Sequence, residues 1–133
     1  MTREEKELLL KDICARMPYG VVIHFDEKTD QDDERLYGMR ENGGKFLIND
    51  AFYIEEVKPY LFPLSSMTEE QKREYNFLKH EVPVCHYEYD DVVEEFELYD
   101  SPESFEYLIE NHFDYRGLIP MGLAIDATGK NIY

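Results

Sequence analysis

One stretch of the sequence, residues 80–115, constrains the fold more than any other because it concentrates charge of one sign. It contains no Lys or Arg and twelve Asp or Glu residues. Apolar and aromatic residues such as Tyr87, Val92 and Phe96 are interleaved with these acids. This mixture predicts ordered structure with one acidic face and one apolar face, and not an acidic tail.

The periodicity in the middle of this stretch leaves its secondary structure open. Residues 84–89 and 94–99 fit two strands, whereas residues 91–97 also fit a short helix. The acidic residues that we expect to face a partner in either case are Glu88, Asp90, Asp91, Glu94, Glu95 and Glu97.

Three helices are predicted from their start signals. A Thr followed by Glu or Gln in a capping-box pattern opens the first two, at Thr2 and Thr68. Ser101 and Pro102 suit the cap and the first position of the third. The predicted helices cover residues 3–16, 68–80 and 102–112. The predicted apolar stripe of the first helix is Leu9, Leu10, Ile13, Cys14 and Met17.

Short strands are predicted where β-branched and aromatic residues gather. The turn around Gly43 and Gly44 predicts a hairpin over residues 35–49, because glycine tolerates positive φ. Pro59 and Pro63 predict an extended connector over residues 58–67 and not a central strand. The predicted strands cover residues 21–25, 36–40, 45–48 and 51–57.

These elements together predict the fold class. A helix followed by successive short strands indicates an α+β fold, with a small, mainly antiparallel sheet packed by about three helices. The length of 133 residues and the absence of a linker or repeat predict a single domain over residues 1–133.

The net charge of −16 bears on the partners that this chain can have. A chain with this charge repels bare phosphate backbones, so direct nucleic-acid binding is not expected. A basic protein partner is compatible with it. The sequence has no apolar run long enough to cross a bilayer and no cleavable leader, which predicts a cytoplasmic protein without a membrane partner. It does not indicate an oligomeric state.

No motif for a phosphate loop, a catalytic triad or a zinc site occurs, so we expect no cofactor and no metal. Asp30, Asp32 and Glu34 have the spacing of calcium ligands, but Arg35 stands where a calcium loop requires glycine. Cation binding at those three acids is therefore disfavoured.

The segment 112–125 has two interpretations. As a binding pocket, His112, Asp114, Tyr115 and Arg116 would hold a small ligand, with the arginine fork on a carboxylate or phosphate. As a structural segment, Arg116 would pair with Asp114 or another nearby acid, and the apolar residues after Gly117 would close the core. The structural interpretation is the simpler one, and we favour it.

Three sequence words resemble a known family. They are residues 14–21 (CARMPYGV), 57–70 (VKPYLFPLSSMTEE) and 112–119 (HFDYRGLI) with 122–124 (GLA). They resemble a family of small proteins of gut anaerobic bacteria and their phages or mobile elements, for which no activity is assigned. The resemblance implies one intact domain, a cytoplasmic setting and an accessory, protein-binding role.

The sequence therefore predicts a non-enzymatic protein-interaction module, an accessory protein of a phage or mobile element, that presents its acidic surface to a basic partner. The alternative is a small-ligand-binding protein or enzyme that uses a pocket at His112, Asp114 and Arg116.

Overall fold

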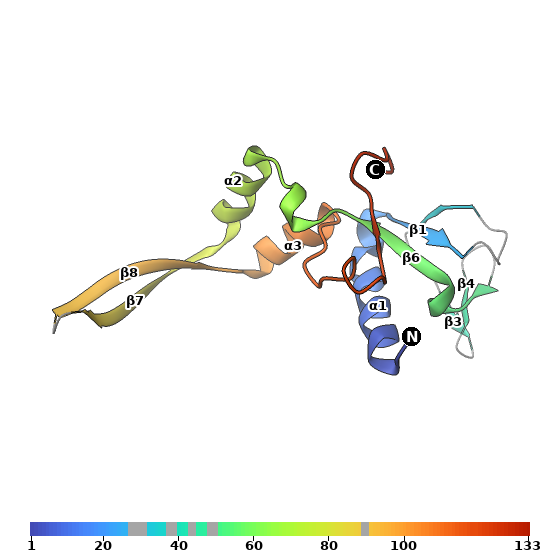
Figure 1. Ribbon diagram of the computed structural model, residues 1–133, viewed down its shortest axis with the longest axis horizontal. Helices are drawn as coiled ribbons and strands as arrows, with labels where there is room; N and C mark the ends of the chain where they lie inside the picture. The colour runs from blue at the N-terminus through green and yellow to red at the C-terminus, as the bar shows by residue number, and fades with distance from the viewer. Residues whose placement is uncertain (27–31, 37–39, 43–44, 48–50, 89–90) are drawn as a thin grey trace. The chain divides into compact units, whose positions relative to one another are not determined.

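The computed structural model describes residues 1–26, 32–36, 40–42, 45–47, 51–88 and 91–133 (Figure 1). Within those ranges only the backbone is described for residues 40–42, 45–47, 51–52, 84, 86–88 and 91–96. These residues form an α+β fold, and in them the chain has three α-helices and a small, mostly antiparallel sheet, as predicted. The possible calcium ligand Asp30 lies outside the described residues.

The chain divides into two compact units. Unit 1 comprises residues 1–66 and 109–133, and unit 2 comprises residues 67–108. The prediction of a single domain concerns independent folding and stays a prediction.

The central element of unit 1 is a four-stranded sheet in the order β2-β1-β6-β9. The strands are β1 (Val21–Phe25), β2 (Glu34–Leu36), β6 (Val57–Leu61) and β9 (Ile125–Asp126). β1 runs antiparallel to both of its neighbours, and β9 joins β6 in parallel. Unit 1 also contains a three-stranded antiparallel sheet of β3 (Arg40–Asn42), β4 (Lys45–Leu47) and β5 (Ala51–Phe52).

Helix α1 (Arg3–Arg16) begins as predicted, since Thr2 and Glu5 form a complete capping box. Its buried face differs from the predicted stripe. Cys14 is exposed, whereas Asp12 and Arg16 are fully buried beside the apolar positions. The prediction for Cys14 was wrong because an ion pair occupies helix positions that an apolar pattern cannot reveal.

Each face of the four-stranded sheet packs against a different part of unit 1. One face meets α1, where Leu9 and Ile13 cluster with Ile23, Phe25 and Leu61. The other face is covered in part by residues near the end of the chain, where Ala127 and Ile132 join Val22 and Tyr60. Since alternate strand residues point to opposite faces, His24 and Lys58 share this second face with Val22 and Tyr60.

Two strand predictions were wrong. Residues 51–57 contain β5, a 3-10 turn at Ile54–Glu56 and the start of β6, and Pro59 lies inside β6, which is a central strand. Proline is tolerated there because β9 pairs with β6 only at Tyr60 and Leu61. On that side, within the described residues, the missing N–H of Pro59 interrupts no ladder.

The predicted hairpin over residues 35–49 is present in a shorter form. β3 pairs with β4 in antiparallel register, with Asn42 opposite Lys45. The predicted second strand, 36–40, falls on the end of β2, the start of β3 and residues outside the described chain.

Unit 2 holds α2 (Glu69–Leu78), the strands β7 (His80–Glu88) and β8 (Asp91–Tyr99), and most of α3 (Pro102–Glu110). Thr68 and Gln71 cap α2 with a complete capping box. Ser101 accepts the Ser104 N–H at the start of α3 and donates to the Leu78 carbonyl at the end of α2. Because β8 covers residues 91–97, the middle of the acidic stretch forms strands and not the alternative helix.

Among the described residues, no helix combines the length and the apolar character that a membrane span requires.

Candidate functional site

The segment after α3 is held by Asp114. Its two carboxylate oxygens accept hydrogen bonds from the backbone N–H groups of Leu118 (2.8 Å) and Ile119 (2.9 Å). The side chain of Asp114 is buried, and Leu118 is fully buried in the core. Asp114 therefore shapes the turn that places Leu118.

Arg116 pairs with an acid of α1 and not with Asp114. Its Nε lies 3.3 Å from Asp12 Oδ1, although without the geometry of a hydrogen bond. Arg16 holds the same carboxylate from Nε at 2.9 Å and Nη2 at 3.2 Å, and also donates to the Phe113 carbonyl at 2.6 Å. The carboxylate of Asp12 thus lies between two guanidinium groups.

Tyr115 lies against the same cations. The guanidinium carbon of Arg116 lies 4.9 Å from the centre of the Tyr115 ring, and that of Arg16 lies at 5.8 Å. Both distances fall within the range of cation–π attraction. Tyr115 and Arg116 therefore belong to the packing around Asp12.

His112 is buried and adopts a left-handed backbone conformation with φ 59°. Its ring stacks on Tyr133, with ring centres 4.0 Å apart, and its Nδ1 has no hydrogen-bond partner among the described atoms. The Tyr133 hydroxyl donates to the Tyr60 carbonyl (2.7 Å) and accepts from the Val22 N–H (3.0 Å). Burial, together with Arg16 and Arg35, lowers the pKa of His112 to about 4.

The four predicted pocket residues are close in the chain, but each of them makes its described contacts with other residues of the protein. His112 stacks on Tyr133, Asp114 holds backbone N–H groups, and Arg116 and Tyr115 surround Asp12. This supports the structural interpretation of the segment. Sequence analysis missed Asp12 and Arg16, although their i, i+4 spacing was a usable signal.

Acidification should destabilise the protein through His112. Its pKa is about 4 in the folded chain and about 6.5 when unfolded. Between these values the unfolded state binds a proton that the native state excludes, so the contribution to stability is full above pH ~6.5 and lost as pH falls towards ~4. We expect about 2–3 kcal/mol of loss across this window.

Urea unfolding at several pH values measures this loss. His112→Asn, which tolerates positive φ, should flatten the pH dependence between ~6.5 and ~4. Identical pH slopes in the wild type and the His112→Asn variant would contradict the assignment.

The first part of the acidic stretch forms a two-stranded ribbon of β7 and β8. β7 and β8 pair antiparallel over nine positions, from His80 opposite Tyr99 to Glu88 opposite Asp91. Since directly opposed residues share a face, the register places four of the predicted binding residues on one face. They are Glu88, Asp91, Glu95 and Glu97. Glu94 takes the other face, and Asp90 lies outside the described residues.

Unit 2 also exposes apolar side chains. Phe77 on α2 is 88% exposed, and Leu98 and Tyr99 on β8 are about half exposed. A groove of about 550 Å³ lies between α2 and α3, where Tyr107 donates to Glu74 at 2.9 Å. The residues that line it are Arg73, Glu74, Phe77, Leu78 and Tyr107.

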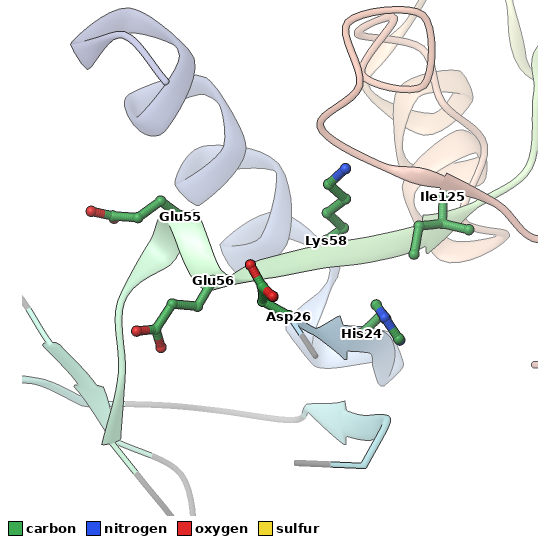
Figure 2. A pocket seen from close by; sticks show the side chains of 6 residues that line it. All are labelled: His24, Asp26, Glu55, Glu56, Lys58 and Ile125. Carbon is green, nitrogen blue, oxygen red and sulfur yellow. The ribbon is translucent and has the colours of Figure 1, made fainter. Parts of the chain in front are cut away.

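A second cavity, of about 320 Å³, lies in unit 1 (Figure 2). It is lined by His24 on β1, Asp26 directly after β1, Glu55 and Glu56 in the 3-10 turn before β6, Lys58 on β6 and Ile125 on β9. Glu55 points away from the other labelled side chains in Figure 2, and its carboxylate pairs with Lys6 at 3.4 Å. Sequence analysis did not identify this cavity.

His24 is held beside this cavity by Asp33. His24 Nδ1 lies 2.7 Å from Asp33 Oδ1, and the Tyr60 hydroxyl donates to Asp33 Oδ2 at 2.8 Å. A carboxylate only accepts hydrogen bonds, so the contact assigns the proton to Nδ1 of the ring. Burial and Asp33 raise the pKa of Tyr60 to about 12, which keeps the hydroxyl a donor.

Among the described residues, no group of His, Cys, Asp and Glu side chains has an arrangement that could hold a metal ion. No protein-family model, curated protein or solved structure matches the chain.

Proposed function

We propose that this chain is a protein-interaction module whose unit 2 binds a basic protein partner. The observation that carries the proposal is the β7–β8 ribbon. It pairs over nine positions, and no third strand joins it among the described residues. An isolated two-stranded ribbon is marginally stable in water, so a bound partner would stabilise it.

The charge of unit 2 supports a basic partner. Residues 67–108 contain thirteen Asp or Glu and three Lys or Arg, so they carry −10 of the total −16. Charge of one sign on one surface accelerates association with an oppositely charged surface and weakens as salt is added. The acids at Glu88, Asp91, Glu95 and Glu97 occupy one face of the ribbon by register.

The exposed apolar groups supply the other part of an interface. Protein interfaces enrich aromatic residues at their centre and place charged residues at the rim. Phe77, at 88% exposure beside an apolar groove, is the strongest such anchor in unit 2. An accessory role in a phage or mobile element belongs to the same proposal, and its support is the resemblance of the three sequence words.

The alternative, a ligand pocket at His112, Asp114 and Arg116, has less support. The Asp114 carboxylate is occupied by two backbone N–H groups, and Arg116 lies against Asp12. A ligand there would have to displace both sets of contacts.

Removing the four acids of one ribbon face should weaken partner binding selectively. The test variant is Glu88→Gln, Asp91→Asn, Glu95→Gln and Glu97→Gln. The matched control removes four exposed acids of unit 1, with Glu4→Gln, Glu7→Gln, Asp32→Asn and Glu55→Gln. At roughly 0.3–0.5 kcal/mol per exposed ion pair, the test variant should lose about 10-fold in affinity and show a smaller salt dependence.

The partner is first captured from host lysate at low salt, then purified, and its dissociation constant is measured against each variant. A Phe77→Ser variant should also lose about 10-fold, but with an unchanged salt dependence. The proposal is contradicted if the captured partner binds the test variant and the matched control equally well. Capture of no basic protein at low salt would also contradict it.

A further inference from the structure

We propose that the outer edge of β8 binds an extended segment of the partner as a third strand of the ribbon, and that basic and apolar residues alternate in this segment. The inference rests on the function proposed for unit 2 and deepens it, because it states which backbone groups would hold the basic partner. It is based on the register of β7 and β8, on Pro83 and on the sequence of β8.

The outer edge of β7 is a poorer template for a new strand than that of β8. Pro83 lies in the middle of β7 and has no backbone N–H. Proline is tolerated in a strand where its missing N–H faces away from the neighbouring strand, so the outer edge of β7 lacks one donor. β8 contains no proline, and its outer edge therefore keeps all of its donors.

The register identifies the backbone groups at the outer edge of β8. Pro83 lies opposite Phe96. In an antiparallel pair, opposed residues alternate between those that exchange hydrogen bonds and those whose N–H and C=O groups point away from the partner strand. Since Pro83 has no N–H to exchange, its pair with Phe96 is of the second kind. The β8 residues that turn their backbone groups outward are therefore Val92, Glu94, Phe96 and Leu98.

These outward groups are open to a further strand. β7 and β8 form a sheet of their own, and within the described parts of the chain no other strand pairs with either. An extended peptide that adds to such an edge gains affinity from main-chain hydrogen bonds and specificity from alternate side chains. The chemistry of the two faces of β8 therefore determines which peptide fits.

The two faces of β8 differ in charge. By register, the first face holds Asp91, Val93, Glu95, Glu97 and Tyr99, and the second holds Val92, Glu94, Phe96 and Leu98. Neighbouring residues on adjacent strands share a face, and opposite charges at such positions attract. A complementary strand therefore places basic residues on the first face and apolar residues on the second.

The ribbon itself has no cation to offer its acids, because residues 80–99 contain no Lys or Arg. Glu97 is exposed, and its Oε2 accepts a hydrogen bond from the Tyr99 hydroxyl at 2.6 Å. That hydroxyl is a neutral donor, so the carboxylate keeps its charge. An added basic strand would supply the opposite charge directly beside it.

Two peptides separate strand addition from the attraction of charge alone. Both have the length of β8 and blocked ends. The first alternates lysine and valine, whereas the second contains the same residues as one block of lysine and one block of valine. We expect the alternating peptide to bind the full chain about 10-fold more tightly, because only its period matches a strand.

Hydrogen exchange at single residues shows whether the edge is used. With the alternating peptide bound at saturation, the outward N–H groups of Phe96 and Leu98 should exchange about 10-fold more slowly, because they become hydrogen-bonded. The N–H groups of Val93 and Glu97 face β7 and should change less. The block peptide should leave the exchange of Phe96 and Leu98 unchanged.

A pair of variants tests the backbone donor itself. Glu94→Pro and Glu94→Gln remove the same charge, but only proline also removes an outward N–H. We expect Glu94→Pro to bind the alternating peptide about 5-fold more weakly than Glu94→Gln does. Slow exchange at Val93 and Glu97 in both variants confirms that β8 still pairs with β7.

The unmodified chain decides the proposal even if the proline variant does not fold. Equal affinity for the two peptides, or unchanged exchange at Phe96 and Leu98 with the alternating peptide bound, would overturn strand addition. Slow exchange at these two residues before any peptide is added would also overturn it, because another segment would then occupy the edge. The proposed function fails separately, if the captured partner binds the four-acid variant and its matched control equally well.

Discussion

Replacing Arg16 with leucine is expected to lower the free energy of unfolding by about 3–5 kcal/mol. Arg16 is fully buried, with 0% of its surface accessible to solvent. Its guanidinium holds the buried Asp12 carboxylate through two hydrogen bonds and donates to the Phe113 carbonyl. Leucine removes the donors and leaves the Asp12 carboxylate and the carbonyl without them.

Arg116→Leu is the matched control for this prediction. Arg116 contacts the same carboxylate, but only through Nε at 3.3 Å and without hydrogen-bond geometry. We expect it to cost about 1 kcal/mol. In the double variant Asp12→Leu with Arg16→Leu, part of the loss should be recovered, because no buried carboxylate remains unpaired.

Chemical denaturation measures all three variants on one scale. If Arg16→Leu lowers the free energy of unfolding by less than Arg116→Leu does, the buried ion pair does not stabilise the fold.

Replacing Asp114 with alanine is expected to cost about 2–4 kcal/mol. The reason is that the Leu118 and Ile119 N–H groups both lose their acceptor, and a buried donor left unsatisfied costs about 1–3 kcal/mol. Asp114→Asn should cost less, because its single carbonyl oxygen can still accept one of the two bonds.

Asp126→Ala is the control for Asp114. Asp126 also accepts a backbone N–H, from Thr128 at 2.9 Å, but it is exposed, so water can replace the carboxylate. We expect a cost of about 0.5 kcal/mol or less. Thermal and urea unfolding measure the stability of both alanine variants. If both lose the same stability, burial of the turn after α3 does not determine the cost of removing the carboxylate.

The helices were predictable from the sequence because their signals are local. Thr2 and Thr68 form the capping boxes that their spacing predicted, and Ser101 caps α3. The strand at Pro59 was not predictable in this way. Whether proline interrupts a sheet depends on which neighbouring strand reaches that position, and that neighbour, β9, lies more than sixty residues later in the chain.

The candidate sites also differ in whether local sequence or the folded sheet reveals them. The acidic stretch was evident from composition, but only the β7–β8 register assigns Glu95 and Glu97 to one face and Glu94 to the other. The cavity in unit 1 gave no sequence signal. His24, Asp33 and Lys58 come from three separate segments, and no motif spacing connects residues that only the sheet brings together.

The long ribbon of β7 and β8 has a further consequence for how the protein behaves at high concentration. Its outer backbone edges have no partner strand among the described residues, and such edges can pair with those of another copy. Pro83 removes one N–H from an edge, and the acids along the ribbon repel a second copy. The negative charge therefore opposes edge-to-edge aggregation, and the same charge attracts a basic surface.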